Sequence, residues 1–89
     1  MGNVNRKITK QEKAAATRAI NQAYPELIVE WGSHSSYGGH RAPRDHTIAF
    51  RLKDGRGKYH SNVVWLMPRE LAGLTPEEVV KLVNWANGK

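Results

Sequence analysis

Histidines and serines are the residues of this chain that offer familiar site chemistry. Three of the four histidines, His34, His40 and His46, recur every six residues, and His60 follows further along the chain. A zinc site needs three or four ligands that converge at about 2 Å on rigid elements. This spacing, within a segment rich in glycine and serine, supplies no such rigidity. We therefore expect neither a metal nor another cofactor.

Ser33, Ser35 and Ser36 beside His34 resemble the nucleophile and base of a hydrolase by proximity in the sequence. Nucleophile and base must act on one reacting atom, and neighbours along a strand or loop rarely converge in that way. The acidic residues are few and scattered, so they do not suggest a carboxylate cluster for a catalytic metal. The sequence therefore predicts a binding protein and not an enzyme.

Positive charge is the strongest compositional feature of the chain, with a formal net charge of +6. One basic block covers residues 1–18, and a second covers residues 41–58, where six basic residues face only Asp45 and Asp54. Two such blocks on a near-neutral remainder indicate a positive face, which favours an anionic partner such as nucleic acid or an acidic protein surface. The alternative interpretation is that the charge serves solubility.

The segment from Gly32 to His46 is a long loop between two predicted strands, and loops of this length in compact domains are usually functional or disordered. Arg41 and Arg44 flank a stiffening Ala42-Pro43 pair, and two ring side chains nearby could stack on bases. Basic residues continue along the following hairpin, within reach of successive phosphates. The predicted nucleic-acid-binding set is Tyr37, His40, Arg41, Arg44, Arg51, Lys53, Arg56 and Lys58.

A protein partner is the competing prediction, with the chain acting through the same loop as a small inhibitor or adaptor of the kind that phages encode. Three tryptophans in 89 residues support it, because Trp, Tyr and Arg dominate interface hot spots. The loop composition also resembles that of antibody binding loops. Trp65 is expected in the core, whereas Trp85 lies off the main apolar stripe of its helix. Trp85 is therefore the candidate for a partner contact or a homodimer interface.

Two helices and three strands must position these residues. Thr9 with Glu12, and Thr75 with Glu78, are capping-box patterns that begin helices. Alternating apolar residues indicate strands, and Asp54-Gly55-Arg56-Gly57 predicts a tight turn between the last two. The expected elements are a helix over 9–24, strands over 26–31, 46–53 and 58–67, a short helical turn over 68–72 and a helix over 75–87.

The predicted fold class is therefore α+β, in the order α-β-β-β-α. The simplest two-layer arrangement is a three-stranded antiparallel sheet with both helices on one face. Ile48, Phe50 and Leu52 are expected to point toward the helices. Ala49 is expected to point toward the other face, where we expect the exposed side chains Glu30, Thr47, Arg51 and Lys53.

This element order is similar to that of the double-stranded RNA-binding domain, in which the loop between the first two strands contacts a minor groove. Gly39-His40 followed by Pro43 resembles that loop. The chain departs from the pattern because its loop is longer. Pro76, Glu77 and Glu78 also begin the last helix, where the resemblance would require lysines. Since acidic residues there would repel phosphate, the resemblance extends to topology only.

Length and composition predict one domain over residues 9–89, preceded by a flexible basic arm over residues 1–8. Without cysteine there are no disulfides. The longest apolar run, Val63 to Met67, is far below the roughly 20 residues that span a bilayer. The N-terminus also lacks the apolar segment of a signal peptide. We expect a cytoplasmic protein with no membrane partner.

Overall fold

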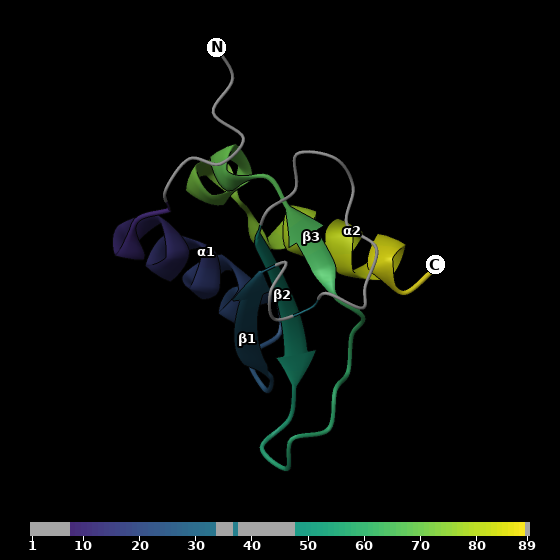
Figure 1. Ribbon diagram of the computed structural model, residues 1–89. Helices are drawn as coiled ribbons and strands as arrows, with labels where there is room; N and C mark the ends of the chain where they lie inside the picture. The colour runs from purple at the N-terminus through teal and green to yellow at the C-terminus, as the bar shows by residue number, and fades with distance from the viewer. Residues whose placement is uncertain (1–7, 34–36, 38–47, 89) are drawn as a thin grey trace.

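A computed structural model describes residues 8–33, 37 and 48–88 of the chain. It shows a single compact α+β domain with a three-stranded antiparallel sheet in the order β1-β2-β3. Both helices lie on the same side of this sheet (Figure 1), so the predicted architecture is confirmed. The elements are α1 (Lys10–Ala23), β1 (Ile28–Ser33), β2 (Ile48–Lys53), β3 (Val64–Leu66), the 3-10 helix η1 (Pro68–Gly73) and α2 (Pro76–Ala86).

Both predicted helix starts are present. The Thr9 side chain accepts a hydrogen bond from the Glu12 backbone N–H at 3.1 Å, and the Glu12 carboxylate accepts one from the Thr9 backbone in return. Thr75 accepts from the Glu78 backbone N–H at 3.2 Å, and Pro76 occupies the first turn of α2. These bonds satisfy donors that have no partner inside the helix, which is why the two helices begin at these positions.

The core lies between the sheet and the two helices. From the sheet, Ile48, Phe50 and Leu52 point inward, as predicted, and they are joined by Val64 and Leu66. The helices and η1 contribute buried small and branched side chains to the same cluster, namely Ala16, Ala19, Ile20, Leu71, Val79 and Val83. The small residues of α1 allow the helix to approach the other elements closely. The described part of the chain contains no helix that could cross a membrane.

The first strand differs in its bounds from the predicted 26–31. The Leu27 N–H donates to the Tyr24 carbonyl at 3.2 Å, so a turn occupies the residues before Ile28. At its other end β1 continues to Ser33, which pairs with Ile48 of β2. The strand therefore begins later than its alternating pattern indicates, because a turn occupies the preceding residues. It ends later because its pairing with β2 continues to Ser33.

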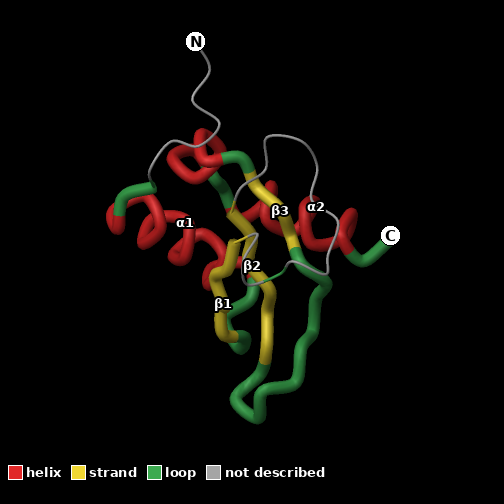
Figure 2. Tube along the Cα trace, viewed as in Figure 1, coloured by secondary structure: helices red, strands yellow, loops and turns green. Residues whose placement is uncertain are grey.

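The prediction of a continuous third strand over residues 58–67 is wrong, because β3 contains only Val64–Leu66. Lys53 pairs with Tyr59 in an isolated bridge, and Phe50 pairs with Val64. Four residues on the returning segment therefore face two residues of β2, which makes this segment a bulge. Figure 2 shows it as a loop between the hairpin tip and β3. Pairing is replaced locally by the Ser61 hydroxyl, which accepts a hydrogen bond from the Leu52 N–H at 2.9 Å.

The sheet face opposite the helices was expected to be exposed, but part of it is covered. Ala49 is fully buried there in a small second cluster with Tyr37, Val63 and Trp65. Trp65 is therefore buried, as predicted, although on this outer face and not in the main core. Thr47 lies outside the described residues. We call this side of the sheet the outer face.

Candidate functional site

Five of the eight residues predicted to bind nucleic acid are described by the structure. Tyr37, Arg51 and Lys53 lie close together on the outer face, and Arg56 and Lys58 lie at the tip of the β2–β3 hairpin. The remaining three, His40, Arg41 and Arg44, lie outside the described residues, as do His34 and His46.

Glu30 of β1 is the centre of a polar network on the outer face, and sequence reasoning did not single it out. One carboxylate oxygen accepts a hydrogen bond from the Tyr37 hydroxyl at 2.9 Å and lies 3.5 Å from the Arg51 guanidinium. The other accepts from the Tyr59 hydroxyl at 2.8 Å and lies 3.4 Å from the Lys53 ammonium. Two of the predicted phosphate-binding cations are thus already paired with a carboxylate.

Hydrogen bonding makes Glu30 a stronger acid. The hydroxyls of Tyr59 and Tyr37, followed by Lys53, lower the pKa of Glu30 from 4.5 to about 2. Burial of the Tyr37 ring, together with its bond to the Glu30 carboxylate, raises the pKa of Tyr37 to about 12. Both shifts favour the same state, in which an ionised carboxylate accepts from a neutral tyrosine.

Arg51 lies between two aromatic rings. Its guanidinium carbon is 3.5 Å from the centroid of the Tyr59 ring and 5.1 Å from that of the Tyr37 ring. Both separations are within the range of cation–π attraction. Arg51 is thereby held between two rings and beside a carboxylate.

Tyr37 has a structural position that differs from the predicted stacking role. Its ring is only 5% exposed and packs edge-on against Trp65, with centroids 6.4 Å apart. A Cβ at Gly32 would lie 2.8 Å from two of the Tyr37 ring atoms, so only glycine leaves room for this ring. Because the Tyr37 ring is buried against the sheet, it offers little surface on which a base could stack.

At the hairpin tip the acidic residue, Asp54, bonds to the backbone of the turn, whereas the basic residues are exposed. The Asp54 carboxylate accepts from the backbone N–H groups of Arg56 and Lys58 at 2.8 and 3.0 Å. Its second oxygen lies 2.9 Å from His60 Nε2. His60 and these two backbone bonds lower the pKa of Asp54 to about 2. Gly57 closes the turn with a φ of +85°.

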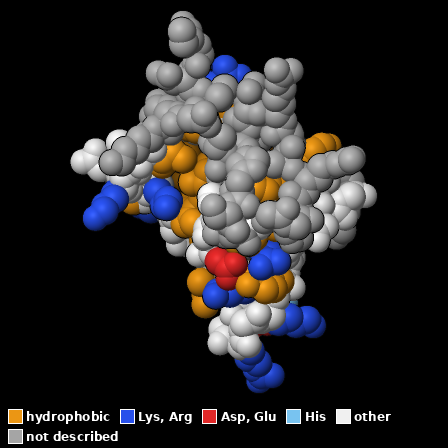
Figure 3. Space-filling view, viewed as in Figure 1, with side chains coloured by type: hydrophobic (Ala, Val, Ile, Leu, Met, Phe, Trp, Pro, Cys, Tyr) orange, Lys and Arg blue, Asp and Glu red, His pale blue; other side chains and the backbone are white. Residues whose placement is uncertain are grey.

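Because Asp54 is engaged in the turn, the side chains left exposed at the tip are cationic. Arg56 and Lys58 are both exposed. Figure 1 shows the hairpin projecting from the body of the domain, and Figure 3 shows basic side chains gathered at the same end. The structure therefore places two of the basic residues predicted to contact phosphate, Arg56 and Lys58, in exposed positions on a projecting hairpin.

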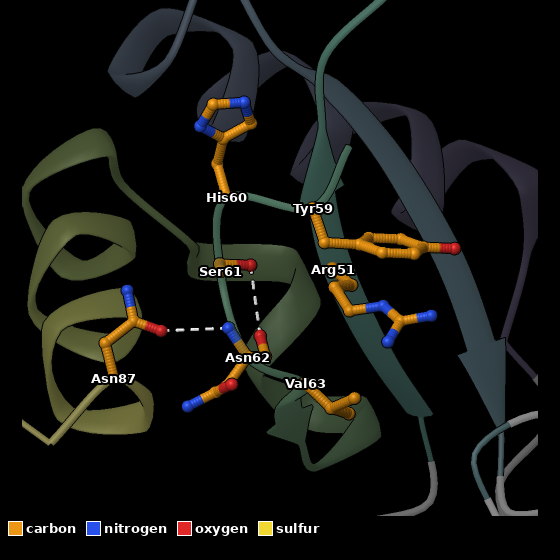
Figure 4. Close-up of a pocket in the computed structure, with 7 residues that line it drawn as sticks. All are labelled: Arg51, Tyr59, His60, Ser61, Asn62, Val63 and Asn87. Atoms are coloured by element: carbon orange, nitrogen blue, oxygen red, sulfur yellow. Dashed lines mark hydrogen bonds between the residues drawn. The ribbon is translucent and has the colours of Figure 1, made fainter. Parts of the chain in front are cut away.

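A shallow groove of about 390 Å³ runs along the bulge, between the outer face and the end of α2 (Figure 4). Asn62 joins the two sides, because its backbone N–H donates to Asn87 Oδ1 at 2.8 Å and its Nδ2 donates to the Ala86 carbonyl at 2.9 Å. The groove is lined by Arg51, Tyr59, His60, Ser61, Asn62, Val63 and Asn87.

Most of this groove was missed by sequence reasoning. Tyr59 was placed on the return strand without a role, and Asn87 was interpreted only as a helix stop. The contact between Asn62 and Asn87 joins residues 25 positions apart, so no local sequence pattern predicts it.

Trp85 of α2 is 74% exposed, and Val80 of the same helix is 38% exposed. The prediction that Trp85 lies off the buried stripe is confirmed by this exposure.

Within the described ranges, no three metal-ligating side chains gather in one place. Comparison of the chain with protein-family models, with curated proteins and with solved structures finds no match in any of the three.

Proposed function

We propose that this protein binds nucleic acid through phosphate contacts made by the β2–β3 hairpin. The observation that carries the proposal is the projecting tip, where Arg56 and Lys58 are exposed while Asp54 is engaged in the turn. Cations on a protruding hairpin can reach successive phosphates, and such contacts supply most sequence-independent affinity for nucleic acid.

The outer face contributes less charge than the sequence suggests. Glu30 lies within 3.5 Å of both the Arg51 guanidinium and the Lys53 ammonium, so it offsets part of their positive potential. In the proposal, the hairpin tip makes the main electrostatic contact. The predicted contacts of His40, Arg41 and Arg44, which lie outside the described residues, would add to it.

Salt-dependent titration tests this proposal. Labelled DNA and RNA, single-stranded and duplex, are titrated with the protein at several salt concentrations. Because log K falls with log[salt] by about 0.9 per neutralised phosphate for duplex DNA, the double variant Arg56→Gln/Lys58→Gln should reduce that slope by about 1.8. The matched control is Lys10→Gln/Arg18→Gln, which removes the same charge from exposed positions on α1.

The control should retain the salt slope of the unmodified protein. Glu30→Gln should increase affinity, because it releases Arg51 and Lys53 from a carboxylate. Absence of measurable binding at low salt would overturn the proposal. An equal loss in the hairpin variant and the α1 control would also contradict it, since net charge alone would then account for binding.

The loop is tested separately, because its contacts were predicted from sequence alone. Arg41→Ala/Arg44→Ala should weaken binding further, whereas unchanged affinity would restrict the interface to the hairpin. We also propose that the protein acts in the cytoplasm.

Protein binding is the second candidate, and the exposure of Trp85 favours it. A large aromatic side chain on a helix surface is typical of interface hot spots. Sedimentation of the unmodified protein and of Trp85→Ser tests for a homodimer. Concentration-dependent association that Trp85→Ser abolishes would support this candidate, and a monomer at all concentrations would exclude self-association through Trp85.

A further inference from the structure

β1 forms one edge of the sheet, and alternate residues along it point their backbone groups away from β2. The Leu52 N–H and C=O both bond to the returning segment, through Ser61 and His60. The residue opposite Leu52, Val29, is therefore in a non-hydrogen-bonded pair. Because bonding direction alternates along a strand, the backbone groups of Val29 and Trp31 point outward. Within the described part of the chain, these groups have no hydrogen-bond partner.

The two edges of the sheet differ in how readily they can pair with another strand. β3 contains only three residues, and Pro68 follows shortly after it. β1 contains six residues, and its pairing with β2 is unbroken over its whole length. Proteins block sheet edges with short strands, prolines, lysines or bulges, and β1 contains no proline, lysine or bulge. Its edge is therefore open to another extended backbone.

Helix α1 lies behind this edge strand (Figure 1). The Trp31 indole joins the two elements, because its Nε1 donates to Thr17 Oγ1 at 3.0 Å and the Lys13 ammonium lies 5.9 Å from its ring centroid. A strand added at the edge would direct every second side chain to this side of the sheet. A hollow of about 280 Å³ is available there, lined by Ile8, Lys13, Trp31, Gly32, Ser33 and Ile48.

We propose that the open edge of β1 binds an extended, acidic segment of a partner protein as a fourth strand. The outward backbone groups of Val29 and Trp31 pair with the segment, and the hollow takes one of its apolar side chains. Main-chain hydrogen bonds give such complexes affinity, and side-chain pockets give them specificity. Alternating N–H and C=O groups match another polypeptide backbone, so this surface differs in kind from the cationic hairpin tip. The inference is independent of the proposed function.

Charge is the reason for assigning an acidic segment. Lys13 is exposed beside the hollow, and the neighbouring Glu12 carboxylate is engaged in the cap of α1. The other exposed acid nearby, Glu26, precedes the opposite end of β1. A second copy of the chain would instead bring a further net charge of +6 to this edge. Symmetric pairing centred on Glu30 would also oppose two carboxylates, and like charges directly opposite each other are destabilising.

Matched peptides test the proposal. The probe is a short blocked peptide that alternates valine and threonine, with two glutamates at its N-terminal end, which meets the Ser33 end of β1 in antiparallel pairing. The control peptide carries lysines in place of the glutamates. In NMR titrations and hydrogen exchange, the acidic peptide should shift and protect the Val29 and Trp31 amides, because an added strand bonds to them and excludes water. The lysine peptide should do neither.

N-methylation of the acidic peptide separates strand pairing from unspecific adhesion. Only alternate residues of an added strand bond to the edge, so methylating one alternate set of peptide nitrogens should abolish binding, whereas methylating the other set should be tolerated. In the protein, Lys13→Gln should weaken binding of the acidic peptide by about 1.5- to 5-fold, as expected for an exposed ion pair. Lys81→Gln, which removes an exposed lysine of α2, is the matched control and should retain the affinity.

The inference is overturned if the two methylated peptides bind equally, if the lysine peptide binds as well as the acidic one, or if no peptide protects Val29 and Trp31. Protection of these amides that rises with the concentration of the protein alone would also overturn it, because a second copy would then occupy the edge. The double variant Arg56→Gln/Lys58→Gln should bind the acidic peptide like the unmodified protein, so failure of the hairpin proposal leaves this test intact.

Discussion

Replacing Ser61 with alanine is expected to destabilise the domain through one orphaned backbone donor. The Leu52 N–H points to the Ser61 hydroxyl at 2.9 Å because the bulge removes the carbonyl that a regular strand would supply. Leu52 is 1% exposed and Ser61 is 9% exposed, so water has little access to the donor. Ser61 also donates to the Asn62 carbonyl at 3.0 Å, but Asn62 is exposed and water can replace that bond.

The cost follows from the burial of the donor. Leaving a buried N–H without a partner costs about 1–3 kcal/mol. For a domain of this length, each kcal/mol lowers Tm by about 4–8 °C. Urea unfolding of Ser61→Ala should therefore show a lower midpoint with an unchanged slope, because the surface exposed on unfolding stays the same. Ser61→Thr retains the hydroxyl and is the matched control.

Hydrogen exchange locates the effect. In Ser61→Ala the Leu52 amide should lose more protection than the amides of Phe50 and Ala49, which lie in the regularly paired part of β2. A stability loss below about 0.5 kcal/mol, with Leu52 still protected, would refute the reasoning. Another acceptor would then satisfy this donor.

Three further predictions concern the turn and the outer face. Gly57→Ala should cost about 1–2 kcal/mol by urea unfolding, because its φ is +85° and nothing crowds the added Cβ; Gly55→Ala, without a positive φ, should stay within about 0.5 kcal/mol. Because the pKa of Glu30 falls from 4.5 to about 2 on folding, its contribution should be complete above pH 4.5 and lost as pH falls through 2, and Glu30→Gln should flatten that part of the stability profile. Because the pKa of Tyr37 rises from 10 to about 12, its contribution should be present below pH 10 and lost as pH rises through 12, and Tyr37→Phe should remove the highest-pH step in tyrosinate absorbance.

Local patterns in the sequence determined the elements of this fold. Thr9 with Glu12 begins α1, and Thr75 with Glu78 begins α2. The alternation of Ile48, Phe50 and Leu52 identified the inner face of β2. The physical basis is short range: a cap acts within one turn of helix, and alternation reports which side of a strand meets the core. Such features can be recognised without knowing what packs against them.

Tertiary structure alone decided the side-chain pairings and the groove at the candidate site. Glu30 meets Tyr59 across 29 positions, and Asn62 meets Asn87 across 25. The alternating pattern predicted a long third strand, but it could not show that the returning segment bulges and that Ser61 replaces a strand partner. From the sequence alone, Arg51 and Lys53 were predicted to be unpaired positive charges. Only the position of Glu30 on the neighbouring strand showed that both form ion pairs. Charge and local periodicity are properties of single segments, whereas neutralisation, burial and groove shape depend on which segments the fold brings together.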